Sequence, residues 1–303
     1  MRPPLSSARA WLQLLRAPNA LTIPGQVLAG AALATSASPG QWPWSRLAAA
    51  AAAGGFLYLF GLLQNDLADL AEDRRDRPAR PLPSGRVTLR AAQVAAWVCA
   101  GSGIGFAWAA GREAGWIGGL LLLLISLYNR RLKKYAGAGE IALGVCRGLL
   151  LALGACPVMP LRMFPLTVWA GAGLFTAYVA AVSAVARDET SGRPLSLALR
   201  ALPLLALLSG IGFLGIAPEG ADLSARHLAI GILLTLVPLR CLLTGGAAGP
   251  RPALVGALLG HLLPMQAALI VWTAADRPRL GLALVLAALT PAYRRLSRRI
   301  AAS

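Results

Sequence analysis

The chain is poor in the residues that build most soluble catalytic and redox sites. Its 303 residues include four cysteines, two histidines and twelve acidic residues, and only 14% of the chain is charged. The cysteines lie within or beside apolar runs without CxxC spacing, so neither a disulfide framework nor a cysteine-bound metal is indicated. With 57% hydrophobic residues and a mean hydropathy of +0.63, the composition excludes an ordinary soluble domain.

Apolar runs of about 20 residues recur along the chain, and each is long enough to cross a hydrocarbon core of about 30 Å. Backbone polar groups in lipid must be satisfied internally, and the Leu, Ala and Gly composition does not alternate as a barrel strand would. We therefore expect one all-α polytopic transmembrane bundle over residues 1–303, with nine or ten spans. The expected spans are 20–36, 46–65, 91–110, 115–129, 139–156, 164–186, 196–217, 226–244, 253–274 and 280–293.

The net charge of +17 comes from arginines that lie between the apolar runs. The positive-inside rule explains this pattern better than nucleic-acid binding does, so no nucleic-acid partner is expected. Basic clusters occur at the N-terminus, after the second, fourth and sixth spans, and in the tail, which predicts a cytoplasmic N-terminus. A basic tail on the same side requires an even number of spans and favours ten. No small-residue cleavage site precedes the first run, so no removable signal peptide is expected.

Five of the twelve acidic residues fall within eleven positions at the end of the second run: Asp66, Asp69, Glu72, Asp73 and Asp76. On a helix, spacings of three and four place Asp66, Asp69 and Asp73 on one face. Like charges near a membrane repel, and a divalent cation relieves that repulsion. Mg²⁺ commonly bridges carboxylates to substrate phosphates. The segment therefore predicts either a Mg²⁺–diphosphate site or a solvated acidic helix end paired with neighbouring arginines.

The segment Asn65–Asp73 resembles the NDxxDxxxD motif of the UbiA-type intramembrane prenyltransferases. Flanking segments are similar to further parts of the family pattern, and the resemblance covers most of residues 10–220. These segments are Arg16–Asn19 (RPxN in the family), Arg77–Gly85 (which contains RPLPSG), Tyr128–Asn129 with Lys133, and Gly144–Arg147.

The resemblance implies an all-α membrane fold around a central cavity that opens sideways to lipid. It implies an enzyme that binds an isoprenyl diphosphate and Mg²⁺ and transfers the isoprenyl group to an aromatic or other lipophilic acceptor. Carboxylate-held Mg²⁺ and basic side chains stabilise charge on the departing diphosphate, and an apolar cavity shields the allylic cation from water.

The same resemblance assigns roles to nine residues. Catalysis and metal binding fall to Asp66, Asp69, Asp73 and Asp188, and substrate binding to Asn65, Tyr128, Lys133, Arg147 and Arg187. Some of these residues also have plainer interpretations. Arg147 inside a span is functional by default, with a structural ion pair as the alternative. Lys133 is equally well explained as a topology signal, and Asn65 as a helix cap.

The second family motif is incomplete in this chain. In Ala184–Gly192, Asp188 and Gly192 fit the DxxxD pattern, but Ala184 stands where the first aspartate belongs. Glu189 is displaced by about 100° round a helix from Asp188. Together with Tyr178–Ala181, Cys146–Leu149 and the extra C-terminal apolar segments, the segment resembles the EboC branch of UbiA-like proteins. That branch occurs in bacteria and implies a bacterial inner-membrane location. Two alternatives to an enzyme remain: a non-catalytic UbiA-like component that binds or transports a lipid or metabolite, and an ordinary transporter with an acidic gate.

Overall fold

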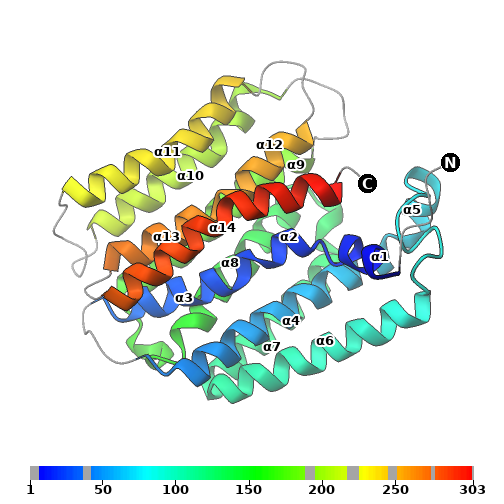
Figure 1. Cartoon of the computed structure of the whole chain (residues 1–303), viewed down its shortest axis with the longest axis horizontal. Helices are drawn as coiled ribbons and strands as arrows, with labels where there is room; N and C mark the ends of the chain where they lie inside the picture. Colours follow the sequence, from blue (N-terminus) through cyan, green and yellow to red (C-terminus); the bar gives the residue numbers. More distant parts are fainter. Residues whose placement is uncertain are drawn as a thin grey trace.

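The computed structural model describes residues 7–36, 42–187, 195–216, 225–244, 251–273 and 277–301, and in these residues the regular secondary structure is helical (Figure 1). The predicted all-α class is confirmed. The helices are α1 (Ser7–Leu14), α2 (Ala17–Ala20), α3 (Thr22–Ala34), α4 (Trp44–Ala68), α5 (Leu70–Asp76), α6 (Leu89–Ala110), α7 (Arg112–Arg130), α8 (Ala138–Ala155), α9 (Leu166–Arg187), α10 (Leu197–Ile216), α11 (Ala225–Thr244), α12 (Arg251–Gly260), α13 (Leu262–Thr273) and α14 (Arg277–Ala301).

Helix boundaries follow local chemistry. The Thr88 hydroxyl accepts a hydrogen bond from the backbone N–H of Ala91 at 3.2 Å, which caps the start of α6. Gly111, with φ of 146°, separates α6 from α7 in a conformation that disfavours residues with a Cβ. Glu140 accepts a hydrogen bond from the N–H of Gly137 at 2.7 Å and so satisfies a donor at the start of α8.

Seven helical stretches of the described residues are long and apolar enough to cross a membrane. They are α4, α6, α8, α9, most of α10 and α11, and Leu254–Thr273, which joins α12 to α13. The other three predicted spans coincide with α3, α7 and α14. Helix α3 has only 13 residues, α7 carries charges at both ends, and α14 carries arginines at both ends. The count of nine or ten spans is therefore not confirmed, although a helix occupies each predicted position.

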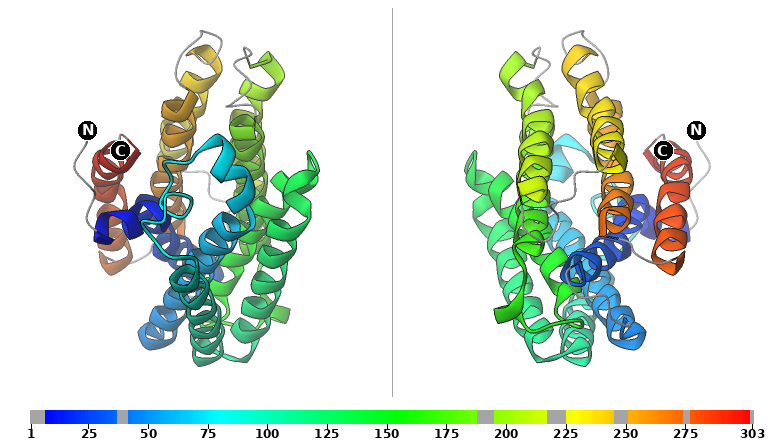
Figure 2. Two further views of the ribbon diagram at one scale, coloured as in Figure 1. Left: turned by 90° about the vertical axis from the view of Figure 1, so that its right-hand side faces the viewer. Right: turned by 90° about the vertical axis from the view of Figure 1, so that its left-hand side faces the viewer.

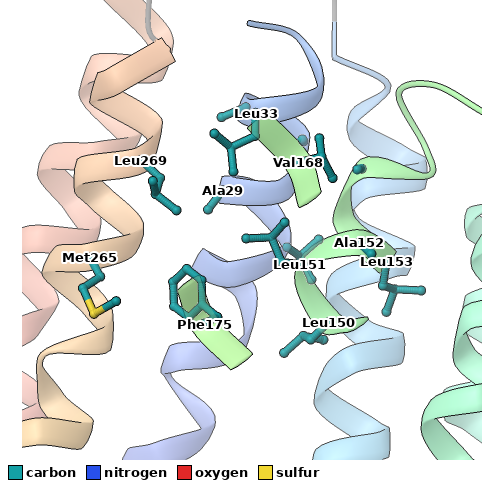
Figure 3. Close-up of a cluster of buried hydrophobic side chains, with 14 of the residues drawn as sticks. Ala29, Leu33, Leu150, Leu151, Ala152, Leu153, Val168, Phe175, Met265 and Leu269 are labelled. Atoms are coloured by element: carbon teal, nitrogen blue, oxygen red, sulfur yellow. The ribbon is translucent and has the colours of Figure 1, made fainter. Parts of the chain in front are cut away.

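The helices pack side by side, with α3, α8, α9 and α13 around the main apolar core (Figure 3). Helices α4, α6 and α7 lie along one side of this core, and α10 and α11 along the other (Figure 1). Glycines allow the closest approaches. A Cβ on Gly154 would overlap the Val27 carbonyl, and one on Gly144 would overlap the Thr176 carbonyl. The Gly-rich composition of these runs therefore serves helix packing.

Helix α1, the last turns of α14 and α5 lie at one end of the bundle (Figure 1). Figure 2 (left) looks onto this end, where α5 and the loop after it occupy the middle of the view. Residues far apart in sequence meet here. Arg16 forms an ion pair with Asp66, and Arg187 forms one with Glu140. The described parts of the basic segments predicted to share one membrane side thus lie at one end of the molecule (Figure 1).

Candidate functional site

Asp66, Asp69 and Asp73 follow one another at this end of the bundle. The N–H of Asp69 donates to the Asn65 carbonyl at 2.9 Å, and the N–H of Asp73 donates to the Asp69 carbonyl at 2.8 Å. Helical hydrogen bonding therefore continues across the junction of α4 and α5 and keeps the three acids on one side, as predicted. Asp66 and Asp73 are 7% and 3% exposed. Glu72 and Asp76, from the same segment, are exposed.

Each of these three carboxylates pairs with a cation from a different part of the chain. Arg16 Nη2 lies 3.3 Å from Asp66 Oδ1. Lys133 Nζ contacts Asp69 Oδ1 and donates to Asn65 Oδ1 at 3.3 Å. Two arginines of the loop after α5 pair with Asp73, Arg80 at 2.6 Å and Arg77 at 3.9 Å. Neighbouring arginines thus pair only with Asp73, and Arg16 and Lys133 come from distant segments.

This arrangement suits a metal that is shared with a phosphate ligand. Within the described residues, no three acidic, His or Cys side chains converge closely enough to hold a metal ion alone. Mg²⁺ is usually bound through one or two carboxylates together with substrate phosphates and water. The donor set therefore fits Mg²⁺ when a diphosphate completes it, and the interleaved cations suit the phosphate oxygens.

Arg187 and Glu140 extend the cluster. Arg187 Nε lies 2.7 Å from Glu140 Oε1, and Arg187 Nη2 donates to the Lys133 carbonyl at 3.0 Å. These contacts hold the backbone of Lys133 next to α9. Tyr128, half-buried at the end of α7, lies within electrostatic reach of Asp69, Arg16, Glu140 and Arg187.

The structure joins Arg147 by hydrogen bonds to α3 and not to the other predicted site residues. Arg147 lies seven residues after Glu140 on α8, which is about 10 Å further into the bundle. Its Nη1 donates to Thr22 Oγ1 at 3.0 Å and to Gln26 Oε1 at 3.3 Å. Its guanidinium carbon lies 5.4 Å from the centre of the Tyr58 ring. Arg147 forms no ion pair with any described carboxylate.

Asp188 and Glu189 lie outside the described residues. Ala184 lines a groove of about 720 Å³ between α8, α9 and α10. Glu140 and Arg187 are the two charged residues of this groove, and most of the rest of its wall is leucine and alanine.

Sequence reasoning did not single out Arg16, Arg80 or Glu140 as site residues. Arg16 and Arg80 lie in segments that resemble family patterns, and this was the available signal. Nothing in the sequence indicated that Arg187 would pair with Glu140, because the two residues are 47 positions apart.

Fold and site together define a helical integral membrane protein with a cluster of paired acidic and basic side chains at one end. The family model of the UbiA prenyltransferase family matches residues 25–285, and the chain belongs to this family. The predicted assignment to the EboC branch stays a prediction.

Individual relatives agree with the family. Over 147 residues the chain is 34% identical to the digeranylgeranylglyceryl phosphate synthase of Ignicoccus hospitalis. The matched region covers 48% of this chain and 46% of that protein. The chain spans about half the length of the curated relatives it matches.

Solved structures share the fold. A UbiA homolog from Aeropyrum pernix K1 in its apo form has a TM-score of 0.66 at 20% identity, covering 84% of this chain and 97% of its own. A UbiA homolog from Archaeoglobus fulgidus bound to GPP and Mg²⁺ has a TM-score of 0.56 at 15% identity, covering 87% and 99%.

Proposed function

We propose that this protein transfers an isoprenyl group from an isoprenyl diphosphate to a lipophilic acceptor within the membrane, with Mg²⁺ as cofactor. The observation that carries the proposal is the pairing of Asp66, Asp69 and Asp73 with cations from separate elements at one end of the bundle. The names and ligands of the related proteins support the same chemistry.

Each side chain of the cluster has a role in this proposal. Asp66, Asp69 and Asp73 hold the metal, and Asn65 adds an amide oxygen beside them. When bound, Mg²⁺ neutralises charge on the diphosphate oxygens. Lys133 and Arg16 turn from their carboxylate partners towards the phosphates as the ligand arrives. Asp188 remains a proposed ligand of a second ion.

Two further residues complete the proposed diphosphate site. Arg187 holds the Lys133 backbone in place through its contact with the carbonyl. We assign Tyr128 to the same site, because the charges of Asp69 and Arg187 act on its hydroxyl. The bond between C1 of the prenyl chain and the diphosphate oxygen breaks, and both electrons leave with the oxygen.

We also propose that the basic end faces the cytoplasm, with the N-terminus on that side. The gathering of the basic loops at one end supports this orientation, because cytoplasmic loops carry an excess of Lys and Arg (Figure 1). Labelling of single cysteines placed at exposed Arg74 and at exposed Arg162, in a variant without the four native cysteines, tests the orientation in intact cells and in inverted vesicles. Arg162 should be the one labelled from outside.

The decisive experiment measures pyrophosphate release by the purified protein with geranyl, farnesyl or geranylgeranyl diphosphate, with and without lipophilic acceptors. We expect release that EDTA stops and Mg²⁺ restores. Asp66→Asn should abolish it, whereas Glu72→Gln, an exposed acid of the same segment, should not. Release that is independent of Mg²⁺ would contradict the proposal.

A second candidate is a non-catalytic binding or transport component, which Ala184 in the second motif favours. This candidate predicts Mg²⁺-dependent binding of the diphosphate without release of pyrophosphate. Equilibrium binding of radiolabelled geranylgeranyl diphosphate, run beside the release assay, separates the two. In both cases Asp69→Ala should abolish the binding while the protein still folds.

A further inference from the structure

Arg147 is a cation inside the bundle, and its partners among the described residues are neutral groups. Its side chain contacts Thr22, Gln26 and Tyr58, and the groups that act on its charge are Tyr58, Cys146 and Tyr293. Thr22 and Gln26 are 1% and 0% exposed, so they belong to the packed interior. Charged side chains within a membrane bundle are expensive and are ordinarily paired. An arginine whose charge has no counterion among the described residues is therefore suited to bind an anion that arrives from outside.

The guanidinium is oriented before any ligand binds. Gln26 accepts from Arg147 Nη1 through Oε1, and its Nε2 donates to the Arg147 backbone carbonyl at 2.6 Å. Thr22 accepts from the same Nη1, and the Tyr58 ring lies beside the guanidinium. Among the described residues nothing accepts a hydrogen bond from Nε or Nη2. That edge of a guanidinium is the one that binds a carboxylate or a phosphate through two parallel bonds.

The position of Arg147 separates it from the proposed diphosphate site. Glu140 lies at the level of Lys133, and Arg147 is about 10 Å deeper along α8. Tyr58, which flanks Arg147, is eight residues before Asp66, or about 12 Å along α4. The residue spacing along α8 and along α4 thus places Arg147 at about the same depth in the bundle. The backbone positions of Arg147 and Tyr58 lie about 10–12 Å deeper along the bundle than those of Glu140 and Asp66.

Prenyl transfer has two reactants, and the anion of the donor is already placed at the acidic cluster. We propose that Arg147, with Thr22 and Gln26, is the subsite for an anionic group of the acceptor, a carboxylate or a phosphate. This inference rests on the proposed prenyltransferase function. An acceptor held by its anion at Arg147 lies between the two charged sites, with its nucleophilic atom directed towards C1 of the donor. The acceptor forms its bond to C1 with its own electron pair and loses one proton, which the released diphosphate or water takes up.

The test uses two matched pairs of acceptors with geranylgeranyl diphosphate and the full chain in nanodiscs. One pair is para-hydroxybenzoate and the neutral para-hydroxybenzamide. The other is a prenyl-ether glycerol phosphate and the same ether without its phosphate. These pairs distinguish an aromatic acid from a phospholipid-like acceptor. We expect the wild type to prefer the charged member of at least one pair by about tenfold or more, the scale of a hydrogen bond to a charged group.

Arg147→Gln should remove this preference and raise the KM for the charged acceptor, while the KM for geranylgeranyl diphosphate stays within about twofold. Arg147→Lys should restore part of the preference, because the charge returns without the two parallel bonds. Arg162→Gln, an exposed arginine at the opposite end, serves as the matched control. Size-exclusion profiles and thermal melts show whether each variant folds.

Direct binding of the four acceptors to the wild type and to both Arg147 variants is measured without donor, so the result does not depend on turnover. The subsite is supported if the wild type binds a charged acceptor about tenfold more tightly than its neutral partner. The Arg147→Gln variant should bind the two members of that pair equally. Equal binding by the wild type within both pairs overturns the subsite, as does a variant that loses donor binding and keeps its acceptor preference. Failure of the proposed function appears separately, as absence of pyrophosphate release with intact acceptor binding. If Arg147→Gln does not fold, the ratio of the Kd values for the neutral and the charged acceptor is measured for Thr22→Val and Arg147→Lys instead. A ratio that falls towards one in these variants supports the subsite, and an unchanged ratio overturns it.

Discussion

Substitution of Asp73 by Asn separates the roles of this carboxylate in stability and in chemistry. Asp73 is buried, but its partners Arg80 and Arg77 have side chains that are 33% and 47% exposed. After the substitution both arginines keep water as a partner, so no buried charge is left unpaired. Ion pairs with such exposed partners contribute up to about 1 kcal/mol. We expect the free energy of unfolding to fall by about that amount at most.

The effect on pyrophosphate release should be much larger. Loss of one group that stabilises developing charge in an active site typically lowers kcat by about 10²–10³-fold, or about 2.7–4 kcal/mol. Asp73→Asn should therefore slow release at least about a hundredfold and shift the Mg²⁺ dependence to higher concentration. Asp76→Asn, an exposed acid three residues further along the same segment, is the control.

The assay follows pyrophosphate release against Mg²⁺ concentration, with thermal melts of the same samples. A rate for Asp73→Asn within about threefold of Asp76→Asn would refute the assignment of Asp73 as a metal ligand, because loss of such a ligand changes the barrier by far more. A loss of rate matched by an equal loss of folded protein would assign Asp73 a structural role instead.

Two further predictions follow from contacts of single residues. Lys133→Gln removes the cation that contacts Asp69, so the KM for the isoprenyl diphosphate should rise by about tenfold or more, and an unchanged KM would exclude Lys133 from phosphate binding. Gly154→Ala places a Cβ against the Val27 carbonyl, and such overpacking costs about 1–3 kcal/mol. Gly173→Ala, where a Cβ meets open space, should be neutral or stabilise by about 0.5–1 kcal/mol. Melting temperatures in one detergent compare the two glycine variants, and equal shifts would contradict the packing argument.

Hydropathy predicted the helices well because each apolar run is held together by its own backbone hydrogen bonds. It could not predict how the helices are divided. Arg16, with φ of 42°, interrupts helical structure between α1 and α2. The first predicted span then yields only the 13 residues of α3. Around His261 the ninth span is divided into α12 and α13, and Pro264 lacks the N–H that would continue the helical bonding there.

The acidic face of the site was predictable for the same local reason. Residues three and four apart share a helix face, and the junction between α4 and α5 preserves this spacing. The partners of these acids were not predictable from spacing. Arg16 is 50 positions from Asp66, and Lys133 is 64 positions from Asp69. Only the packing of α4 against α7 and the N-terminal segment brings them together. The depth of Arg147 is likewise a tertiary property, because it depends on which turn of α8 faces Thr22 and Tyr58.

Ala184 offers a test of whether the incomplete second motif limits the reaction. Ala184 lines the groove between α8, α9 and α10, one helical turn before Arg187. A carboxylate introduced there would stand beside Arg187, which already pairs with Glu140. It would therefore compete with Glu140 for Arg187 and add a like charge next to it.

We accordingly expect Ala184→Asp to release pyrophosphate no faster than the wild type, with Ala184→Asn as the neutral control of similar size. The slower variant should be the charged one, because weakening the pair between Arg187 and Glu140 loosens the contact of Arg187 with the Lys133 carbonyl. Steady-state rates across a Mg²⁺ titration give the comparison. A rise in rate that appears only with Asp would mean that position 184 supplies a missing metal ligand. In that case the natural chain binds its diphosphate without efficient turnover, and the orientation of α9 would have to differ from the one described.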